Sequence, residues 1–296
     1  MAEQAAAMVA PEQIVRRPSW QRRYLRMARQ NPLGVLGLVL TVLLIVVGVF
    51  APVLAPHAAN DFVDKPGLGP SWSTPFGTDK FGEDIFSRVI LGARISLEVG
   101  FISVAFGTIV GTIIGAWSGF KGGIVDSIVQ RIVDTMIAFP ALVFLLVIVR
   151  LLNPSIENVI IAVGILIIPS VARIIRGGAL SERNNLYIEA ARSIGASDSR
   201  ILFKHIVPNI FPLAIVIATT LLGTAILAEA SLSFLGLGIP PPSPSWGIDI
   251  STARNSFPYN VSAALFPGLA ISLTVLGFNL LGDALRDILD PRLRGR

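Results

Sequence analysis

The chain has 296 residues, of which 53% are hydrophobic and only 15% are charged, and its mean hydropathy is +0.71. Soluble domains carry about 25% charged residues, so this composition excludes an ordinary soluble protein. The formal net charge is +5 and there are no cysteines, which excludes a disulfide framework, a thiol nucleophile and a thiolate metal site.

The N-terminal segment 1–32 is rich in arginine, and we expect a basic, partly helical cytoplasmic leader there. Whether it only sets the topology or also contacts a partner is left open. An apolar run follows at 33–51. It is longer than the apolar core of a signal peptide, about 7–15 residues, and its basic flank is long, so we interpret it as an uncleaved anchor.

Uncharged apolar runs of about 18 or more residues predict membrane-spanning helices, because such a helix crosses a hydrocarbon core about 30 Å thick. Four runs meet this length: 33–51, 99–120, 206–228 and 255–282. Two shorter runs, 135–149 and 158–172, are bracketed by ionisable residues that can reach toward the interfaces. The sequence therefore predicts an all-α integral membrane protein with six transmembrane helices.

The basic residues indicate the orientation of these spans. With the N-terminus in the cytoplasm, only six of the 24 Lys and Arg residues fall on the outer side: Lys65, Lys80, Arg88, Arg94, Arg150 and Arg254. This distribution follows the positive-inside rule and places both termini in the cytoplasm. It also explains the positive net charge without a nucleic-acid partner.

Two outward loops interrupt the apolar pattern. The loop at 56–93 is rich in proline and glycine and contains aromatic residues such as Trp72, so we expect it to lie on the membrane face. The loop at 235–260 contains Pro240, Pro241, Pro242 and Pro244 and cannot form a regular helix, because proline removes a backbone donor.

The inward segment 177–209 carries the clearest local signals. We expect a helix over 180–194 that ends at Gly195, and a second short helix that Ser197 caps and Pro208 ends. Its exposed side would offer the apolar residues Ile194, Ile201 and Phe203 beside Arg192 and Arg200, a mixture suited to a groove on a partner protein. A DNA-binding helix-turn-helix is the rival interpretation, and tethering between two spans argues against it.

The same segment carries a family resemblance. Residues 187–197 read Tyr-Ile-Glu-Ala-Ala-Arg-Ser-Ile-Gly-Ala-Ser and are followed by Ile201, His205, Ile206, Pro208 and Asn209. This pattern closely resembles the EAA loop of binding-protein-dependent ABC importer permeases, whose coupling helix inserts into a cleft on a cytoplasmic ATPase. The resemblance implies these coupling residues: Glu189, Ala190, Ala191, Arg192, Gly195, Ala196, Ile201 and Phe203.

The resemblance covers nearly the whole chain from about residue 31. Segments 76–88 and 92–97 are similar to the outward segment of the C-type subunit in the dipeptide/oligopeptide (nickel) permease class, except that Glu83 stands where that class usually has arginine. Segments 228–247 and 278–292 are similar as well. The resemblance implies the type I ABC importer permease fold over 33–296, with the coupling loop at about 177–209.

Two further segments carry candidate sites. The inward turn at Gly122, Gly123 and Asp126 resembles a second, smaller ATPase contact; the alternative is a glycine turn with salt-bridged helix ends. Glu229, with Ser231 nearby, is a candidate for the substrate pathway or gate, since a carboxylate near the end of a span is costly unless it is paired or hydrated. The alternative for Glu229 is a structural hydrogen bond to backbone in the proline-rich loop.

No catalytic residues are predicted, because the chain contains neither a P-loop nor a His-Glu-x-x-His motif. No metal site is predicted either, since His57 and His205 fall on opposite sides of the membrane. The resemblance implies that this chain binds no cofactor and that ATP and Mg²⁺ are used by partner subunits. Those partners would be two cytoplasmic ABC ATPases, a second homologous permease subunit, a substrate-binding protein at the outward loops, and membrane lipid.

The resemblance implies a non-catalytic, multi-pass permease of a prokaryotic inner membrane that imports di- and oligopeptides. Nickel complexes or oligosaccharides are alternative cargoes within the same class. An ion-coupled secondary transporter is a less favoured alternative, because the four long spans lack the ionisable residues such proteins use near the bilayer midplane. A scaffold that only recruits an ATPase is a third.

Overall fold

The computed structural model describes residues 31–254, 256 and 259–289, so the expected leader lies outside the described residues except for its last two. Within these ranges the regular structure is helical, apart from an isolated β-bridge between Thr78 and Asp84. The elements are α2 (Pro32–Val49), α3 (Ala51–Leu54), α4 (Ile85–Lys121), α5 (Gly123–Ala138), α6 (Ala141–Leu152), α7 (Ile156–Arg183), α8 (Leu186–Ser193), α9 (Asp198–Ile201), the π-helical η2 (Leu202–Ile206), α10 (Val207–Phe234), α11 (Trp246–Ala253) and α12 (Ser262–Leu289).

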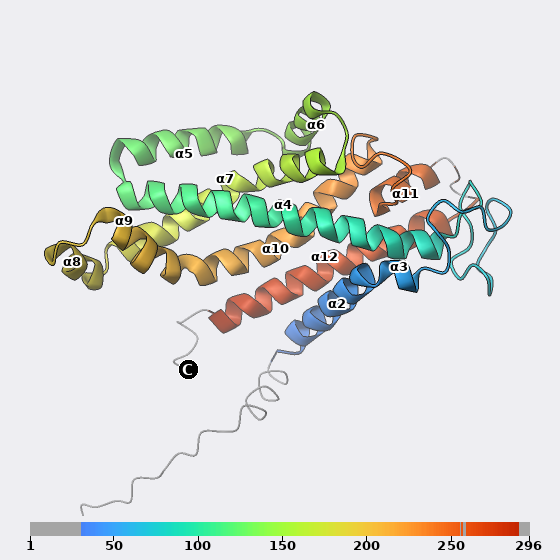
Figure 1. Ribbon diagram of the computed structural model, residues 1–296, viewed down its shortest axis with the longest axis horizontal. Helices are drawn as coiled ribbons and strands as arrows, with labels where there is room; N and C mark the ends of the chain where they lie inside the picture. The colour runs from blue at the N-terminus through green and yellow to red at the C-terminus, as the bar shows by residue number, and fades with distance from the viewer. Residues whose placement is uncertain (1–30, 255, 257–258, 290–296) are drawn as a thin grey trace, which may run out of the picture.

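The long helices run along one axis and separate two functional ends (Figure 1). The pair α8 and α9 lies at one end, whereas the 55–84 loop and α11 lie at the other. The first and last described residues lie toward the α8 end, where the Asn31 Nδ2 atom donates a hydrogen bond to Asp287 Oδ2 at 3.3 Å. Segments predicted to face inward and outward thus lie at opposite ends of the bundle, with the α8 end as the predicted inner end. We call these the inner and outer ends.

Among the described residues, five helices are long and apolar enough to cross a membrane: α2, α4, α7, the continuous Asp198–Phe234 helix and α12. The third expected span, 135–149, is not a straight helix. Its residues are divided between α5 and α6, which meet at a bend of 94° and make a sixth span only if the bent pair counts as one. The bend follows from Pro140, because the residue before a proline is driven from helical to extended backbone, and Phe139 has ψ 137°.

Helices α4 and α7 pack backbone against backbone. On α4, glycine recurs every fourth residue from Gly107 to Gly119. A Cβ atom on Gly115 would lie 2.3 Å from the carbonyl oxygen of Ala172 in α7, closer than atoms can approach. Small residues at this spacing allow two backbones to meet directly, which is how membrane helices gain packing energy.

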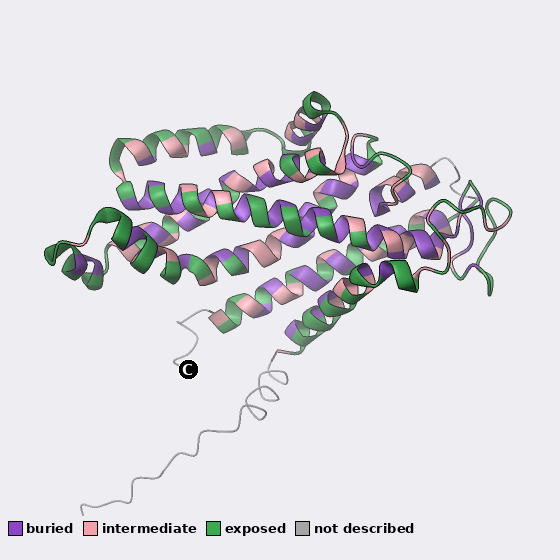
Figure 2. Cartoon of the chain, in the orientation of Figure 1, coloured by how far each residue is buried: buried purple, intermediate pink, exposed green. Residues whose placement is uncertain are grey.

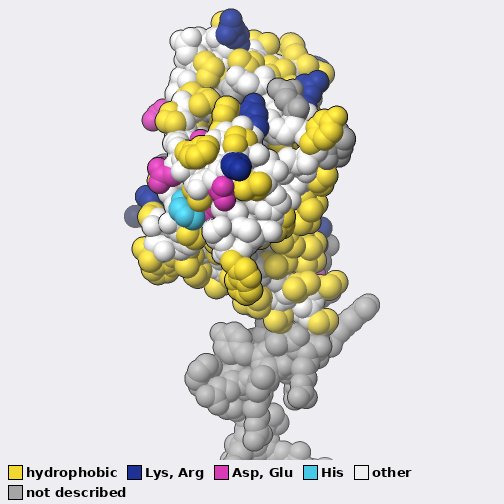
Figure 3. Space-filling model, turned by 90° about the vertical axis from the view of Figure 1, so that its right-hand side faces the viewer, with side chains coloured by type: hydrophobic (Ala, Val, Ile, Leu, Met, Phe, Trp, Pro, Cys, Tyr) yellow, Lys and Arg dark blue, Asp and Glu magenta, His cyan; other side chains and the backbone are white. Residues whose placement is uncertain are grey.

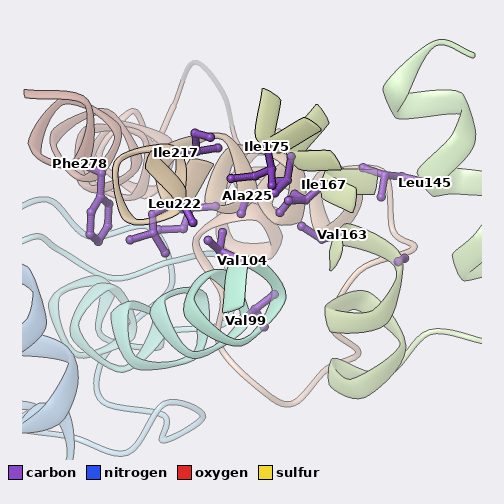
Figure 4. Packing of buried hydrophobic residues seen from close by; sticks show 14 of the residues in the cluster. Val99, Val104, Leu145, Val163, Ile167, Ile175, Ile217, Leu222, Ala225 and Phe278 are labelled. Carbon is purple, nitrogen blue, oxygen red and sulfur yellow. The ribbon is translucent and has the colours of Figure 1, made fainter. Parts of the chain in front are cut away.

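The apolar core lies between α4, α7 and α10, where residues such as Val104, Ile167, Ile175 and Ile217 pack together (Figure 4). By contrast, much of α2 and α5 is exposed (Figure 2). Those exposed positions include large apolar side chains, among them Ile124 at 80% exposure. Such surfaces suit contact with lipid or with another membrane subunit rather than with water.

Candidate functional site

The inner end is built from two helices joined by a tight turn. The single helix expected over 180–194 is in fact two, because α7 continues to Arg183 and α8 starts at Leu186. Asn185 breaks the helix with extended backbone, φ −79° and ψ 144°, and its side-chain amide donates to Glu182 Oε2 at 2.9 Å. Asparagine commonly competes with helix by such local hydrogen bonds.

The predicted end of this helix at Gly195 is confirmed. Gly195 has φ +80°, its N–H donates to the carbonyl of Arg192 at 2.9 Å, and the N–H of Ala196 donates to the carbonyl of Ala191 at 3.0 Å. This is the Schellman arrangement, which requires a residue with positive φ and therefore favours glycine. The turn after α8 is thus fixed by the backbone itself.

The predicted cap at Ser197 is also confirmed, since its Oγ accepts a hydrogen bond from the N–H of Arg200 at 3.4 Å. The expected end at Pro208 is wrong. The helix passes through η2 into α10, and Pro208 occupies the first turn of α10. Proline is tolerated in a first turn, and the wider π turn precedes it, so the chain runs without interruption from Asp198 to Phe234.

The surface offered by α8 and α9 differs from expectation at one residue. Ile194 and Phe203 are 86% and 67% exposed, and Glu189, Ala190 and Arg192 are exposed as well. Ile201 is completely buried and packs in the core, so it cannot belong to the exposed side, and Ala191 is buried too. Leu186, at 81% exposure, was not anticipated and adds to the apolar surface.

Helix α8 is fastened to its neighbours by a small polar network. The Tyr187 hydroxyl donates to Glu182 of α7, and Asn209 Nδ2 of α10 donates to the Tyr187 hydroxyl at 3.1 Å and to the His205 carbonyl at 2.7 Å. Burial and the hydrogen bond to Glu182 raise the pKa of Tyr187. The hydroxyl therefore remains protonated and links α8 to both long helices.

The inward turn between α4 and α5 lies against this element. Lys121 Nζ is 2.9 Å from Asp198 Oδ2, and the guanidinium of Arg192 is 5.7 Å from the centre of the Phe120 ring. Gly122 and Gly123 both have positive φ, at 66° and 59°. The two inner segments singled out in the sequence thus form one surface.

Asp126, the third residue of the inward turn, is engaged within the chain. Its two carboxylate oxygens accept hydrogen bonds from Arg176 Nε and Nη2, both at 2.5 Å. This bidentate geometry is the strong form of an Arg–carboxylate pair. The glycine turn with salt-bridged helix ends is therefore present, and a contact between this turn and an ATPase stays a prediction.

Glu229 is fully buried in α10 near the outer end. Its carboxylate accepts hydrogen bonds from Ser233 Oγ at 2.8 Å and from Ser96 Oγ of α4 at 3.1 Å. Its partners are serine hydroxyls rather than the backbone expected in the structural alternative. With no exposed surface in the isolated chain, Glu229 is packed inside the bundle, and its role at a pathway or gate stays a prediction. Ser231 is half-buried and donates to the Leu227 carbonyl at 2.7 Å.

The outer end holds an ion-pair cluster that the sequence reasoning missed. Arg88 Nε and Nη2 donate to Asp249 Oδ1 at 2.9 and 2.6 Å, while Nη1 donates to Glu83 Oε2 at 2.6 Å and to the Ala59 carbonyl at 2.9 Å. Figure 3 views this end, where acidic side chains gather beside the histidine. The cluster joins the 56–93 loop, α4 and α11.

The acidic members of this cluster are poorly solvated. Burial raises the pKa of Glu83, and the charge of Arg88 opposes the rise. Burial likewise raises the pKa of Asp249, again opposed by Arg88. One signal could have revealed the pair, since Asp249 is the only acidic residue in the 235–260 loop. Glu83, which departs from the usual arginine of the permease class, here serves as a partner of Arg88.

A cavity of about 270 Å³ lies between the bent α5–α6 pair, α7 and α10. Its lining is mostly apolar, with Phe139, Phe144 and Leu166 among the larger side chains and Ser170 and Thr224 as polar contributors.

Two family models match the chain. One, described as binding-protein-dependent transport system inner membrane component, matches residues 111–295, and the other, described as the N-terminal TM domain of oligopeptide transport permease C, matches residues 19–70. The chain is 44% identical over 293 residues to the glutathione transport system permease protein GsiD of Escherichia coli O1:K1 / APEC, covering 98% of this chain and 96% of the relative. A GsiD of Shigella flexneri serotype 5b (strain 8401) is 46% identical over the same lengths.

A solved structure is also similar. A chain from the inward-facing conformations of the MetNI methionine ABC transporter aligns with a TM-score of 0.57 and 21% identity, covering 69% of this chain and 97% of that one. At this identity the likeness concerns the fold. The aligned fold is that of an importer permease, consistent with the separation of inner and outer ends described above.

Proposed function

The chain belongs to the family of binding-protein-dependent transport system inner membrane components and is a multi-pass permease subunit of an ABC importer, and we propose that its cargo is di- or oligopeptides. The supporting observation is the 44% identity, across 98% of the chain, to permeases named for glutathione, which is itself a tripeptide. The match to an oligopeptide permease C domain at residues 19–70 supports the same class.

The α8–Gly195–α9 element is proposed as the surface that docks on an ATPase subunit. The geometry of the element supports this proposal. The element lies at one end of the bundle and exposes Leu186, Ile194 and Phe203 beside the charged Glu189 and Arg192. Apolar anchors with a polar surround are typical of interface cores. The inward turn at 121–126, joined to it by the Lys121–Asp198 pair, would form the edge of the same docking surface.

This geometry offers a route by which ATP could drive transport. The exposed α8 is bound through Tyr187 to Glu182 of α7 and Asn209 of α10, and α9 continues directly into α10. A displacement of the ATPases would therefore move two spanning helices together. Rigid-body shifts of packed helices are a common form of such switching. ATP and Mg²⁺ would be used by those two ATPase subunits.

The remaining partners follow from the domain layout. We assign the transmembrane domain to 33–296 and the outward loops to 56–93 and 235–260, where a substrate-binding protein would dock. The Arg88 cluster holds both loops against α4, which gives that docking surface a fixed shape. A second, homologous permease subunit would complete the pathway against this chain.

The cargo is tested by uptake into proteoliposomes that contain the complete complex with its binding protein. ATP-dependent accumulation of labelled di- or tripeptides, with no accumulation of a nickel chelate or an oligosaccharide, is the expected result. Uptake of either of the latter in preference to peptides would contradict the peptide proposal and leave the importer class intact. Accumulation without ATP would favour a secondary transporter.

A further inference from the structure

A polar stripe runs along one face of α5. Asp126, Gln130 and Asp134 recur every fourth residue, so they lie on one side of the helix. They face α7, where Arg176 binds Asp126 and Arg173 Nη2 donates to Asp134 Oδ1. Between them, the Gln130 Nε2 atom is buried without a hydrogen-bond partner among the described residues.

The opposite face of α5 has a different character. Ile124, Ile128 and Ile132 are 80%, 58% and 58% exposed, and they too recur every fourth residue. Helix α5 therefore turns an apolar stripe outward and a charged stripe toward α7.

The Asp134–Arg173 pair lies at the depth of the membrane. In α4, the uncharged stretch 99–120 is about 33 Å long and marks the apolar slab. Gly115 of this stretch contacts Ala172, the residue before Arg173. Since Gly115 precedes the inner end of the stretch by five residues and Arg173 is one residue closer to that end than Ala172, the Arg173 backbone lies about 6 Å inside the slab.

The pair is also accessible at this depth. In the isolated chain the side chain of Asp134 is 54% exposed and that of Arg173 is 44% exposed. Charged side chains within a membrane almost always face the bundle interior or a water-filled space, because contact with lipid chains is costly. Because the pair is both inside the apolar slab and exposed, we expect it to lie beside water.

The cavity between α5 and α10 is the place where this aqueous space would lie. Met136 and Ser170 line it. Asp134 lies two residues before Met136, and Arg173 lies three residues after Ser170, so the pair borders the cavity on its inner side. Its volume of about 270 Å³ is close to the lower limit of about 300 Å³ for ligand pockets.

We propose that Asp134 and Arg173 face the aqueous translocation path and bind the charged termini of a zwitterionic peptide on its way to the inner end. Arg173 would bind the terminal carboxylate and Asp134 the terminal ammonium. In the empty path the two side chains neutralise each other, as they do here. Arginine suits this role because its planar donors match a carboxylate. The assignment of the ligand rests on the proposed function, whereas the assignment of the aqueous face does not.

The aqueous face is tested by chemical labelling. The chain contains no cysteine, so Ser170→Cys places a single thiol one helical turn from Arg173 and leaves the ion pair intact. Ile132→Cys, on the apolar stripe two residues from Asp134, is the matched control. In the assembled complex, a water-soluble charged thiosulfonate should modify Ser170→Cys at least about tenfold faster than Ile132→Cys, and a dipeptide should slow the reaction.

Two labelling results would overturn the proposal. Modification of Ser170→Cys only by a lipid-soluble maleimide would place this face against lipid. Protection from both reagents would place it against the second permease subunit. Both readouts remain interpretable if the complex carries a cargo other than peptide, so failure here is distinct from failure of the proposed function.

Peptide contact is tested by Arg173→Gln and by the exchanged variant Asp134→Arg with Arg173→Asp. We expect peptide uptake to fall about tenfold or more in Arg173→Gln, with ATP hydrolysis and thermal stability retained, and to stay low in the exchanged variant. Wild-type uptake by Arg173→Gln would contradict the proposal. Recovery in the exchanged variant would show that the pair is only a structural clamp, since a clamp tolerates reversed charges.

Discussion

Arg88 and Asp249, 161 residues apart in the chain, are joined by two hydrogen bonds to a single carboxylate oxygen, at 2.9 and 2.6 Å. The second oxygen, Asp249 Oδ2, is buried and has no partner among the described residues. Nearly all of the compensation for the buried charge of Asp249 therefore comes from Arg88. Together with the hydrogen bond from Trp246 Nε1 to the Val89 carbonyl at 2.9 Å, this contact fixes α11 on α4 at the outer end.

Replacing one member of this pair should destabilise the chain strongly. Arg88→Met leaves the Asp249 charge buried and unpaired, and breaking a buried pair in this way costs about 3–5 kcal/mol. The triple variant Arg88→Met, Asp249→Leu and Glu83→Gln should recover most of that loss, because it removes all three charges of the cluster and apolar replacements of a buried ion pair are often neutral. Thermal unfolding in detergent measures both. Equal stability of the single variant and the wild type would contradict the assigned role.

Because the backbones of α4 and α7 touch at Gly115, we expect that any side chain at this position destabilises the chain. Even Gly115→Ala brings a Cβ within 2.3 Å of the Ala172 carbonyl oxygen, so the helices must separate. We expect a loss of about 1–3 kcal/mol, as for other overpacked sites. Gly268→Ala is the control, since nothing lies within 4 Å of its Cβ and alanine favours the helix. If both variants unfold at the same temperature, the close approach is not present.

Substitutions of the buried Glu229 distinguish a structural role of its carboxylate from a role as a gate. Glu229→Leu leaves the Ser96 and Ser233 hydroxyls without their acceptor, which should cost about 1–3 kcal/mol. Glu229→Gln keeps one acceptor oxygen and should lose less. Unfolding temperature and peptide uptake are measured together. Lost uptake in Glu229→Gln at unchanged stability would support the gate interpretation.

Two isoleucines of the inner element should behave in opposite ways. Ile201 is completely buried, so Ile201→Ala should lower stability by about 2–5 kcal/mol. Ile194 is 86% exposed, so Ile194→Ala should change stability by less than about 0.5 kcal/mol and instead weaken ATPase binding. Unfolding curves of the isolated chain and ATPase binding by the same two variants check this. The reverse pattern would show that the exposed surface has been misassigned.

Local signals in the sequence predicted local structure well. Gly195 and Ser197 were identified from backbone preferences that act within a few residues, and both act as predicted. The long uncharged runs predicted the straight spans for a similar reason, because the thickness of the membrane sets their length. The bend after Ala138 could also have been anticipated, since Pro140 restricts the residue before it.

Contacts between distant segments were harder to predict. The burial of Ile201 depends on the core that α7 and α10 form around it, which its neighbours in sequence do not reveal. The pairing of Arg88 with Asp249 requires knowing that α11 folds back onto α4. The uninterrupted helix through Pro208 depends on the π turn of η2, for which the sequence holds no simple signal.

We propose that the α8–Gly195–α9 element couples this permease to its ATPases. The most direct measurement is co-purification of the ATPase subunits with the tagged chain from detergent, comparing wild type with Glu189→Arg and with the outer-end control Trp72→Ala, both changes at exposed positions. We expect wild type and Trp72→Ala to retain the ATPases in equal amounts, and Glu189→Arg to lose them while remaining folded. Full retention of the ATPases by Glu189→Arg would contradict the claim.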